Sequence, residues 1–275
     1  MPSTQQQSPV VTFLSDYGLI DDFVGICHGV ILTACPQARI IDLTHGIARH
    51  DVRSGAIILA EAIPYVPVGV HLAVVDPDVG AQRRAVALRT GDGRRFVGPD
   101  NGLLTVAADA AGGIIEVVDI AQSSFRLRPV SATFHGRDIF APVAAALARG
   151  ATLVDAGSPI DAGDLVTISL PEPQIRDGAV VAHVRYVDRF GNLQLNVGHE
   201  DLAQTGLRLG RAASIEPGDG SAHPVHYVRT FADAVRDELL LYEDAQRRLA
   251  VAVNHGDASQ RLGLSVDDEL RIRPG

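Results

Sequence analysis

The feature that most constrains the fold of this chain is a change of pattern near residue 165. Before this point, short β-branched segments alternate with segments whose apolar residues recur at helical spacing. After it, strand-like segments dominate, and no strong amphipathic helix separates most of them. Alternating strands and helices are typical of an α/β layer with a largely parallel sheet. We therefore predict an N-terminal α/β domain over residues 10–165 and a smaller β-rich domain over residues 175–275, preceded by a polar tail over residues 1–9.

The expected elements follow from these patterns. In the first domain, strands are predicted at Val10–Leu14, Arg39–Leu43, Val70–Val75, Ala85–Leu88, Arg95–Val97 and Ile114–Ile120, and helices at Asp21–Cys35, Val52–Ile63, Gly102–Ala110 and Asp138–Ala148. Beyond them, strands are predicted at Leu165–Leu170, Ala179–Val187, Leu193–Val197, Arg211–Ile215, Leu239–Tyr242, Leu249–Val253 and Glu269–Ile272. The expected linker is Pro171-Glu172-Pro173, because proline interrupts regular structure.

Composition excludes several classes of function. All 24 basic residues are arginines, which rules out a Schiff-base lysine, a catalytic lysine base and a P-loop lysine. A formal net charge of −9 and the lack of any long basic cluster argue against a nucleic-acid partner. Cys27 and Cys35 are too few for a disulfide framework or a four-cysteine zinc site, so we expect buried, reduced thiols.

The sequence also argues against a membrane or secreted protein. Residues 1–8 are polar and lack the apolar core of a signal peptide. The most apolar long window, residues 55–75, contains Glu61, Pro64 and Pro67, which predicts a helix, a turn and a strand in place of a membrane span. We therefore expect a cytoplasmic protein without a membrane partner.

Polar clusters stand at the ends of predicted strands, where open α/β sheets bind ligands. Asp16 precedes a glycine turn and is not needed as a helix cap, so it is a candidate ligand for the two hydroxyls of a ribose. Asp21 lies where a carboxylate complements a helix N-terminus, and capping is its alternative role. Asp76 follows a buried strand directly, and the seven-residue offset to Arg83 allows the loop to fold back and pair the two, although an Asp before Pro is also a common turn residue.

Two further clusters have a structural and a functional interpretation. His135 stands before Gly136 and ahead of a helix start, which would present its imidazole at a cleft edge, and the adjacent Arg137 and Asp138 could form a local ion pair. The segment Asp188–Asn192 has the composition of a hairpin turn. In the functional alternative, Phe190 would stack on an adenine and Asn192 would contact its edge, but the spacing alone favours the turn.

No segment has the spacing of a known metal or nucleotide motif. HExxH, CxxC and EF-hand patterns are missing, as are GxSxG, Walker A and GxGxxG. The site therefore has to be interpreted from the polar clusters taken together.

Six motifs in one order, from about Val10 to Arg273, are far more specific than any cluster alone. They are DYGLIDDFVG (16–25), VVDPDVG (74–80), VGPDNGLL (97–104), FHGRDIFAP (134–142), DRFGNLQLN (188–196) and LAVAVNHGDA (249–258). With them the chain resembles the S-adenosyl-L-methionine (SAM) hydrolase (adenosine-forming) family, also called SAM hydroxide adenosyltransferases, which are related to the fluorinase and chlorinase. The resemblance covers nearly the whole chain.

This resemblance implies an architecture and a set of site residues. It implies an N-terminal α/β domain, a C-terminal β-barrel-like domain, and a homotrimer whose sites lie between the N-terminal domain of one subunit and the C-terminal domain of the next. The set that holds the nucleophilic water in the hydrolase branch falls on Asp76, Arg83 and His135. The substrate contacts fall on Asp16 for the ribose diol, Phe190, Asn192 and Phe231 for adenine, Asp21 and Asp188 for the methionine amino group, and Asn254 in the adenine-side motif.

The implied reaction is attack of an activated water on C5′ of SAM, which gives adenosine and L-methionine without a metal or an organic cofactor. A halogenase is the first alternative, but that branch has other residues in place of Asp76 and His135, and the fluorinase has a serine in place of Gly136. A non-catalytic module that binds adenosine or SAM is the second. A nucleoside hydrolase is disfavoured, because Leu14 stands where its first calcium-binding Asp should be.

Three positions depart from the family pattern. Asp78 replaces the usual Gly of VVDPGVG, and we expect a minor effect because Asp tolerates unusual turn conformations. Ala245 stands where many relatives have a Ser near the methionine carboxylate, and Arg247 where they have a Gly. These two changes put the expected carboxylate contacts in question.

Overall fold

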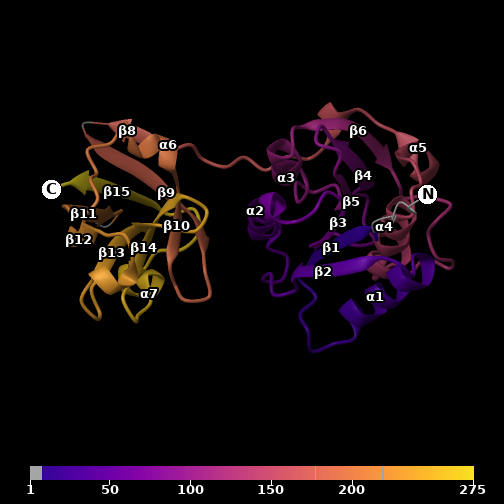
Figure 1. The fold of residues 1–275 in the computed structure, drawn as a ribbon, viewed down its shortest axis with the longest axis horizontal. Coiled ribbons are helices and arrows are strands. Elements are labelled where there is room, and N and C mark those ends of the chain that lie inside the picture. The colour runs from indigo at the N-terminus through magenta and orange to yellow at the C-terminus, as the bar shows by residue number, and fades with distance from the viewer. Residues whose placement is uncertain (1–7, 177, 219) are drawn as a thin grey trace, which may run out of the picture. The chain divides into compact units, whose positions relative to one another are not determined.

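The computed structural model describes residues 8–176, 178–218 and 220–275 (Figure 1). The chain divides between Ile168 and Ser169 into two compact units, called here the N-terminal and C-terminal domains. The sequence places the end of the first domain at residue 165 and the linker at Pro171-Glu172-Pro173. Residues 1–7 of the predicted tail lie outside the described residues.

The described part of the N-terminal domain contains one seven-stranded sheet in the order β2-β1-β3-β5-β4-β6-β7. Strands β2, β1, β3, β5 and β6 point in one direction, while β4 and β7 run against them. The sheet is thus mostly parallel, as predicted. The strands are β1 (Val10–Ser15), β2 (Arg39–Thr44), β3 (Val70–Val74), β4 (Ala85–Thr90), β5 (Arg95–Pro99), β6 (Ile114–Asp119) and β7 (Ser158–Pro159).

Helices cover both faces of this sheet because its central strands are apolar on both sides. Along β3 and the residue after it, Leu72 and Val74 pack with α1 and α4, whereas Ala73 and Val75 pack with α2 and α3. The result is a three-layer α/β domain with a core on each face of the sheet (Figure 1). The helices are α1 (Phe23–Ala34), α2 (Val52–Ala62), α3 (Thr105–Ala110), α4 (Ala141–Ala148) and the short α5 (Leu153–Ala156).

The C-terminal domain is a closed seven-stranded barrel. Its strands follow the order β10-β14-β13-β12-β11-β15-β9, and the pairing of β9 with β10 closes the ring, while β8 adds to the outer side of β9. Alternate residues such as Val180, Ala182 and Val184 on β9 point into its core. The elements are β8 (Gln174–Arg176), β9 (Ala179–Val187), β10 (Leu193–Gly198), α6 (His199–Leu202), β11 (Ala212–Pro217), β12 (His223–Tyr227), β13 (Leu239–Glu243), β14 (Arg248–Val253), α7 (Ala258–Leu262) and β15 (Glu269–Pro274).

The predicted fold class is confirmed, but individual elements differ. The strand predicted at Leu165–Leu170 is wrong: the segment has no strand partner, because the Val166 amide instead donates to Asp100 Oδ1 at 2.9 Å and Ile168 packs on Gly102. β12 was not predicted, because its sequence HPVHY contains a proline and little apolar alternation. The helix predicted from Asp138 begins with a π-turn over Gly136–Phe140, and such turns are frequent at functional sites.

None of the helices in the described parts of the chain is long and apolar enough to cross a membrane.

Candidate functional site

Three of the predicted residues meet in the N-terminal domain. Arg83 Nε donates to Asp76 Oδ1 at 2.8 Å, and Arg83 Nη2 donates both to Asp76 Oδ2 and, at 2.9 Å, to His135 Nδ1. The side chains of Asp76 and Arg83 are only 5% and 8% exposed. The bidentate ion pair is therefore shielded from water, and one guanidinium nitrogen links the carboxylate to the imidazole.

The sheet and its loops position this triad. Asp76 follows β3 at the carboxyl edge of the sheet, where Asn101 holds the strand end by donating from Nδ2 to the Val75 carbonyl at 2.8 Å. The loop to Arg83 folds back through Gly80, whose φ of +82° and contact with the Ala132 carbonyl exclude a β-carbon. The guanidinium then lies 5.2 Å from the centroid of the Phe140 ring, in the π-turn that follows His135.

The protonation of His135 follows from its partner. Burial and the neighbouring charge of Arg83 lower the pKa of His135 below its ordinary value, so the ring is neutral near pH 7. A guanidinium has only donors, so His135 Nδ1 must accept the bond from Arg83. The single ring proton of neutral His135 therefore resides on Nε2, which can donate a hydrogen bond but cannot accept one.

Tyr17 forms a wall of the same region. A β-carbon on Gly136 would overlap the Tyr17 hydroxyl, so glycine at this position is what lets the phenol approach the residue next to His135. Burial raises the pKa of Tyr17 well above its ordinary value, and the charges of Cys27, Asp16 and Asp76 raise it further. Tyr17 is thus a neutral phenol near two of the predicted carboxylates. Sequence analysis did not assign it, although it stands beside Asp16 in the first motif.

Asp16 and Asp21 lie in the loop between β1 and α1. Asp16 is half-buried, and its Oδ2 accepts a hydrogen bond from the His50 backbone amide at 3.1 Å. His50 donates this bond from a left-handed conformation with φ of +67°, an uncommon backbone geometry that is enriched at functional sites. Asp21 is exposed, and its side chain forms no hydrogen bond or ion pair with any residue that the structure describes. It does not cap α1, whose N-cap position belongs to Asp22, also without a side-chain bond.

In the C-terminal domain, Asp188 organises the turn between β9 and β10. Its Oδ1 accepts from the amides of Phe190 and Asn192 at 2.8 and 3.0 Å, and its Oδ2 accepts from Asn192 Nδ2 at 2.8 Å. The segment therefore forms the predicted hairpin turn, in which Asp188 and Asn192 hydrogen bond to each other. Phe190 is the exception: the residue is 65% exposed, and the Arg189 guanidinium lies 5.2 Å from the centroid of its ring.

The turn is held by the loop that follows β14. A β-carbon on Gly191, whose φ is +78°, would overlap the Asp257 carboxylate, and the Gly191 carbonyl accepts from the Ala258 and Ser259 amides at 3.1 and 3.0 Å. This contact joins the fifth motif to the sixth. It presents Phe190 on a fixed turn.

Phe231 and Asn254 also come together in this domain. Asn254 Nδ2 donates to the Ala234 carbonyl at 2.8 Å and so holds the short turn that starts at Phe231. The Phe231 ring lies 4.9 Å from the ring of Tyr242, centroid to centroid. Burial raises the pKa of Tyr242 to about 12, with a further rise from the charge of Asp188. Tyr242 thus lies near both Phe231 and Asp188, and no sequence motif indicated this proximity.

The two positions that depart from the family pattern in this domain lie in the β13–β14 turn. Arg247 adopts a φ of +58°, a left-handed conformation that explains why a glycine suits this position. Ala245 and Arg247 are both exposed. The neighbouring Asp244 shapes the turn by accepting from the amides of Gln246 and Arg248 at 2.8 and 2.9 Å.

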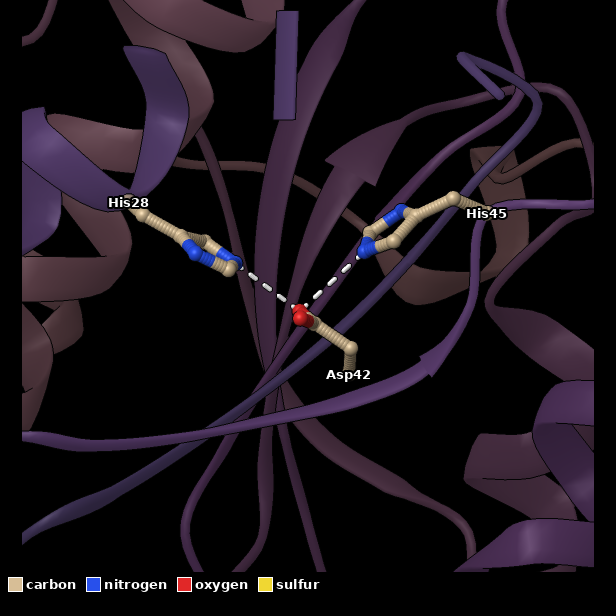
Figure 2. A group of neighbouring side chains, drawn as sticks. All are labelled: His28, Asp42 and His45. Carbon is tan, nitrogen blue, oxygen red and sulfur yellow. Dashed lines mark hydrogen bonds and ion pairs between the residues drawn. The ribbon is translucent and has the colours of Figure 1, made fainter. Parts of the chain in front are cut away.

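Two other features of the N-terminal domain lie outside the triad. An apolar groove of about 660 Å³ is lined by α1 and α4 residues such as Ile26, Val30 and Ala146, and none of the triad residues contributes to it. Few polar groups line this groove, so it lacks the reacting groups of an active site. Figure 2 shows the second feature, in which His28, Asp42 and His45 converge with spacing that suits a metal ion. No sequence motif indicated this cluster, because its members come from separate elements.

Residues 11–157 match the family model described as the SAM hydroxide adenosyltransferase N-terminal domain, and residues 182–271 match the C-terminal domain of the same family. The chain is 46% identical to the (R)-S-adenosyl-L-methionine hydrolase of Salinispora tropica over 98% of this chain and 99% of that protein. It is 29% identical to a fluorinase of Actinoplanes sp., over 90% of this chain and 91% of the fluorinase. An uncharacterised conserved protein from Thermotoga maritima has the same fold, with a TM-score of 0.89 at 34% identity over 96% of this chain and 99% of its own.

Proposed function

The chain belongs to the SAM hydroxide adenosyltransferase family, and from this premise we propose that it hydrolyses S-adenosyl-L-methionine to adenosine and L-methionine. The observation that carries the proposal is the triad of Asp76, Arg83 and His135, whose side chains bond to one another at the carboxyl edge of the sheet. Fluorinases are more distant relatives than the hydrolases are.

The chemistry requires little beyond a positioned water. The sulfonium of SAM makes C5′ electrophilic and turns methionine into a neutral leaving group. The water oxygen forms a bond to C5′, the C5′–S bond breaks, and its electron pair stays on the methionine sulfur. One proton leaves the water as it attacks. Alignment of the water with the C5′–S bond therefore supplies the larger part of the rate.

The geometry favours Asp76 as the group that receives this proton. His135 Nε2 carries a proton and can only donate, so neutral His135 is suited to orient the water or the ribose oxygen. The Asp76 carboxylate has four acceptor positions, and its two bonds from Arg83 leave room for a water. Arg83 holds Asp76 in place and stabilises hydroxide character as it develops. No step in this scheme needs a metal or an organic cofactor.

The substrate is proposed to span two half-sites. Asp16 would accept both ribose hydroxyls and Asp21 would contact the methionine ammonium, since Asp21 has no partner among the described residues. Phe190 would stack on adenine, with Phe231 and Asn192 beside it, while Asn254 holds the Phe231 turn. Asp188 would contact the ammonium through its one remaining acceptor position.

A homotrimer would bring the half-sites together, with the N-terminal domain of one subunit against the C-terminal domain of the next. Support comes from apolar side chains that each half-site leaves in water. Leu19 and Ile20, between Asp16 and Asp21, are 77% and 99% exposed, and Phe190 is 65% exposed. Such side chains at a site indicate a surface that another surface or a ligand covers.

We place the enzyme in the cytoplasm, where SAM is the small-molecule partner and neither nucleic acid nor membrane is bound. The net charge of −9 supports the first exclusion. Cys27 and Cys35 are buried free thiols, which fits a reducing compartment.

The test is to incubate the purified chain with SAM, with and without EDTA and chloride, and to separate the products by chromatography. Adenosine and methionine in equal amounts, unaffected by EDTA or chloride, are the expected result. A 5′-halo product would indicate a halogenase. Binding of adenosine or SAM without turnover would indicate a binding module.

Asp76→Ala is the variant that tests the mechanism. We expect turnover to fall about 1,000-fold while adenosine binding is retained, because the group that aligns the water is lost but the ribose and adenine contacts are not. Turnover comes from product chromatography and adenosine binding from calorimetry. Wild-type turnover in this variant would remove Asp76 from the mechanism.

A further inference from the structure

A second cluster of reactive side chains lies apart from the triad, where α1 meets the edge strand β2. Asp42 Oδ1 lies 2.9 Å from His28 Nε2 and 3.1 Å from His45 Nε2. The three atoms all lie within 4.8 Å of one another (Figure 2). His28 comes from the middle of α1, Asp42 from β2 and His45 from the residue after β2. Both imidazoles point toward a single carboxylate from opposite sides (Figure 2).

Hydrogen bonding accounts for only one of the two contacts to Asp42, because His28 Nε2 forms a hydrogen bond with Asp42 Oδ1 and His45 Nε2 does not. The His45 side chain is only 2% exposed, yet its Nε2 forms no hydrogen bond, although the Asp42 oxygen lies close to it. A buried polar atom without a partner is costly and calls for an explanation. A metal ion supplies one, because it binds the lone pair of Nε2 and the carboxylate oxygen together and needs no proton between them.

The surroundings of His45 match those of a metal ligand. Its other ring nitrogen, Nδ1, lies 2.8 Å from Ser15 Oγ. A histidine that binds a metal through Nε2 usually donates from Nδ1 to an oxygen, which fixes the tautomer and the ring orientation.

We propose that His28 Nε2, Asp42 Oδ1 and His45 Nε2 bind one divalent transition-metal ion of the zinc class. Two imidazoles and one carboxylate are a ligand set that suits zinc, at about 2.0–2.2 Å from each atom. A tetrahedral ion with such bonds separates its ligand atoms by about 3.3 Å, so the 2.9 and 3.1 Å to Asp42 need to widen by a few tenths of an ångström. The two imidazole nitrogens, which lie within 4.8 Å of each other on opposite sides of the carboxylate, need to move closer together. His28 and Asp42 are 28% and 41% exposed, which leaves a side open for a water to complete the coordination.

The site would act as a brace for the predicted ribose ligand. Ser15 Oγ, which contacts His45, also accepts from the Tyr17 amide at 3.2 Å, and the His45 carbonyl accepts from Gly18 at 2.8 Å. These bonds flank Asp16 on both sides. A metal on His45 would therefore reinforce a loop that these hydrogen bonds already hold, without contact with the reacting atoms, so hydrolysis does not require it.

Zinc binding is tested on the full-length chain after removal of metals with a chelator. Titration calorimetry with Zn²⁺ alone should give one ion per chain with a Kd of about 1 µM or tighter. His28→Ala and Asp42→Asn should each weaken binding about 100-fold, because each removes one of three ligands. His199→Ala is the matched control, since His199 pairs with the single carboxylate of Glu243 at 2.6 Å, and binding should be unchanged.

Cobalt provides a second readout that a non-specific surface site would not give. The wild-type chain with one equivalent of Co²⁺ should develop the strong visible absorption of a four-coordinate ion, and the two ligand variants should lose it. Circular dichroism confirms that the variants fold. Equal Zn²⁺ affinity in wild type, His28→Ala and Asp42→Asn, or no stoichiometric binding at 100 µM Zn²⁺, would overturn the proposal. Both measurements omit SAM, so either outcome leaves the proposed hydrolysis untouched.

Discussion

The two domains build their parts of the proposed site in opposite ways. In the N-terminal domain, the triad comes from two loops: Asp76 and Arg83 lie between β3 and β4, and His135 is 52 residues beyond Arg83. In the C-terminal domain, Asp188 and Asn192 lie within one turn and bond to each other. In the N-terminal domain, side chains hold one another in place by hydrogen bonds. In the C-terminal domain, the Asp188 side chain holds the backbone of the turn, from which Phe190 projects. Substitutions in the first should therefore affect chemistry, and substitutions in the second should affect shape.

After Asp76, the largest effect is expected at Arg83. Arg83→Lys keeps the charge but cannot bridge Asp76 and His135, because an ammonium lacks the planar fork of a guanidinium. We expect kcat to fall about 100-fold or more with little change in KM. Arg84→Lys is the control, since Arg84 is the next residue in the chain and pairs with Asp100, outside the triad. Equal losses in both variants would mean that local structure, and not the bridge, is responsible.

The C-terminal turn allows the opposite experiment. Asp188→Ala removes the acceptor of three hydrogen bonds and should lower the free energy of unfolding by about 2 kcal/mol. Asp188→Asn keeps an acceptor for the two backbone amides, so its cost should stay below about 1 kcal/mol. Urea unfolding measures both.

The same pair of variants separates a turn residue from a substrate ligand. If the Asp188 carboxylate also contacts the methionine ammonium, Asp188→Asn should raise KM for SAM about tenfold while stability is nearly kept. An unchanged KM in Asp188→Asn would restrict Asp188 to the turn and would sharpen the contrast between the domains.

The domains should also differ in their response to acid. His71 is fully buried on β3, where burial and then Arg94 lower its pKa to about 3. The unfolded chain binds a proton at this residue below about pH 6.5 and the folded chain does not, so the stabilisation is complete above pH 6.5 and is lost as the pH falls.

Between pH 6.5 and pH 5 this residue alone should lower the free energy of unfolding by about 2 kcal/mol. In urea unfolding, the free energy of unfolding of His71→Leu should fall by about 2 kcal/mol less than that of the wild type over this pH range. His226→Leu, on the exposed surface of β12, is the control and should behave as the wild type does. Identical pH dependence in His71→Leu would contradict the assignment.

The smallest effect is expected at Arg247. Because its φ is +58°, Arg247→Gly should raise the free energy of unfolding by about 0.5–1 kcal/mol. Gln246→Gly is the matched control in the same turn and should lower it by a similar amount, since Gln246 is not among the described residues with positive φ. Stabilisation by both substitutions would show that turn flexibility, and not the left-handed conformation, sets the effect.

Sequence analysis predicted most elements because they repeat a local pattern. The apolar, β-branched runs of β1, β3 and β9 and the helical spacing along α1 are properties of neighbouring residues, and the structure keeps them. The strand predicted at Leu165–Leu170 is wrong, since a strand also requires a partner. β12 was not predicted, because a proline-containing strand has no clear sequence pattern. Pairing is decided by distant segments, which a local pattern does not report.

The same division holds for the site. The six motifs and the family resemblance single out the candidate site residues. The turn Asp188–Asn192 could be predicted from five consecutive residues, because its hydrogen bonds stay within them. Only the tertiary structure decided that Arg83 joins Asp76 to His135, that the Tyr17 hydroxyl fills the space beside Gly136, and that His28 meets Asp42 and His45. Contacts between side chains from separate loops depend on sheet order and loop path, and neither is encoded in the spacing of residues along the chain.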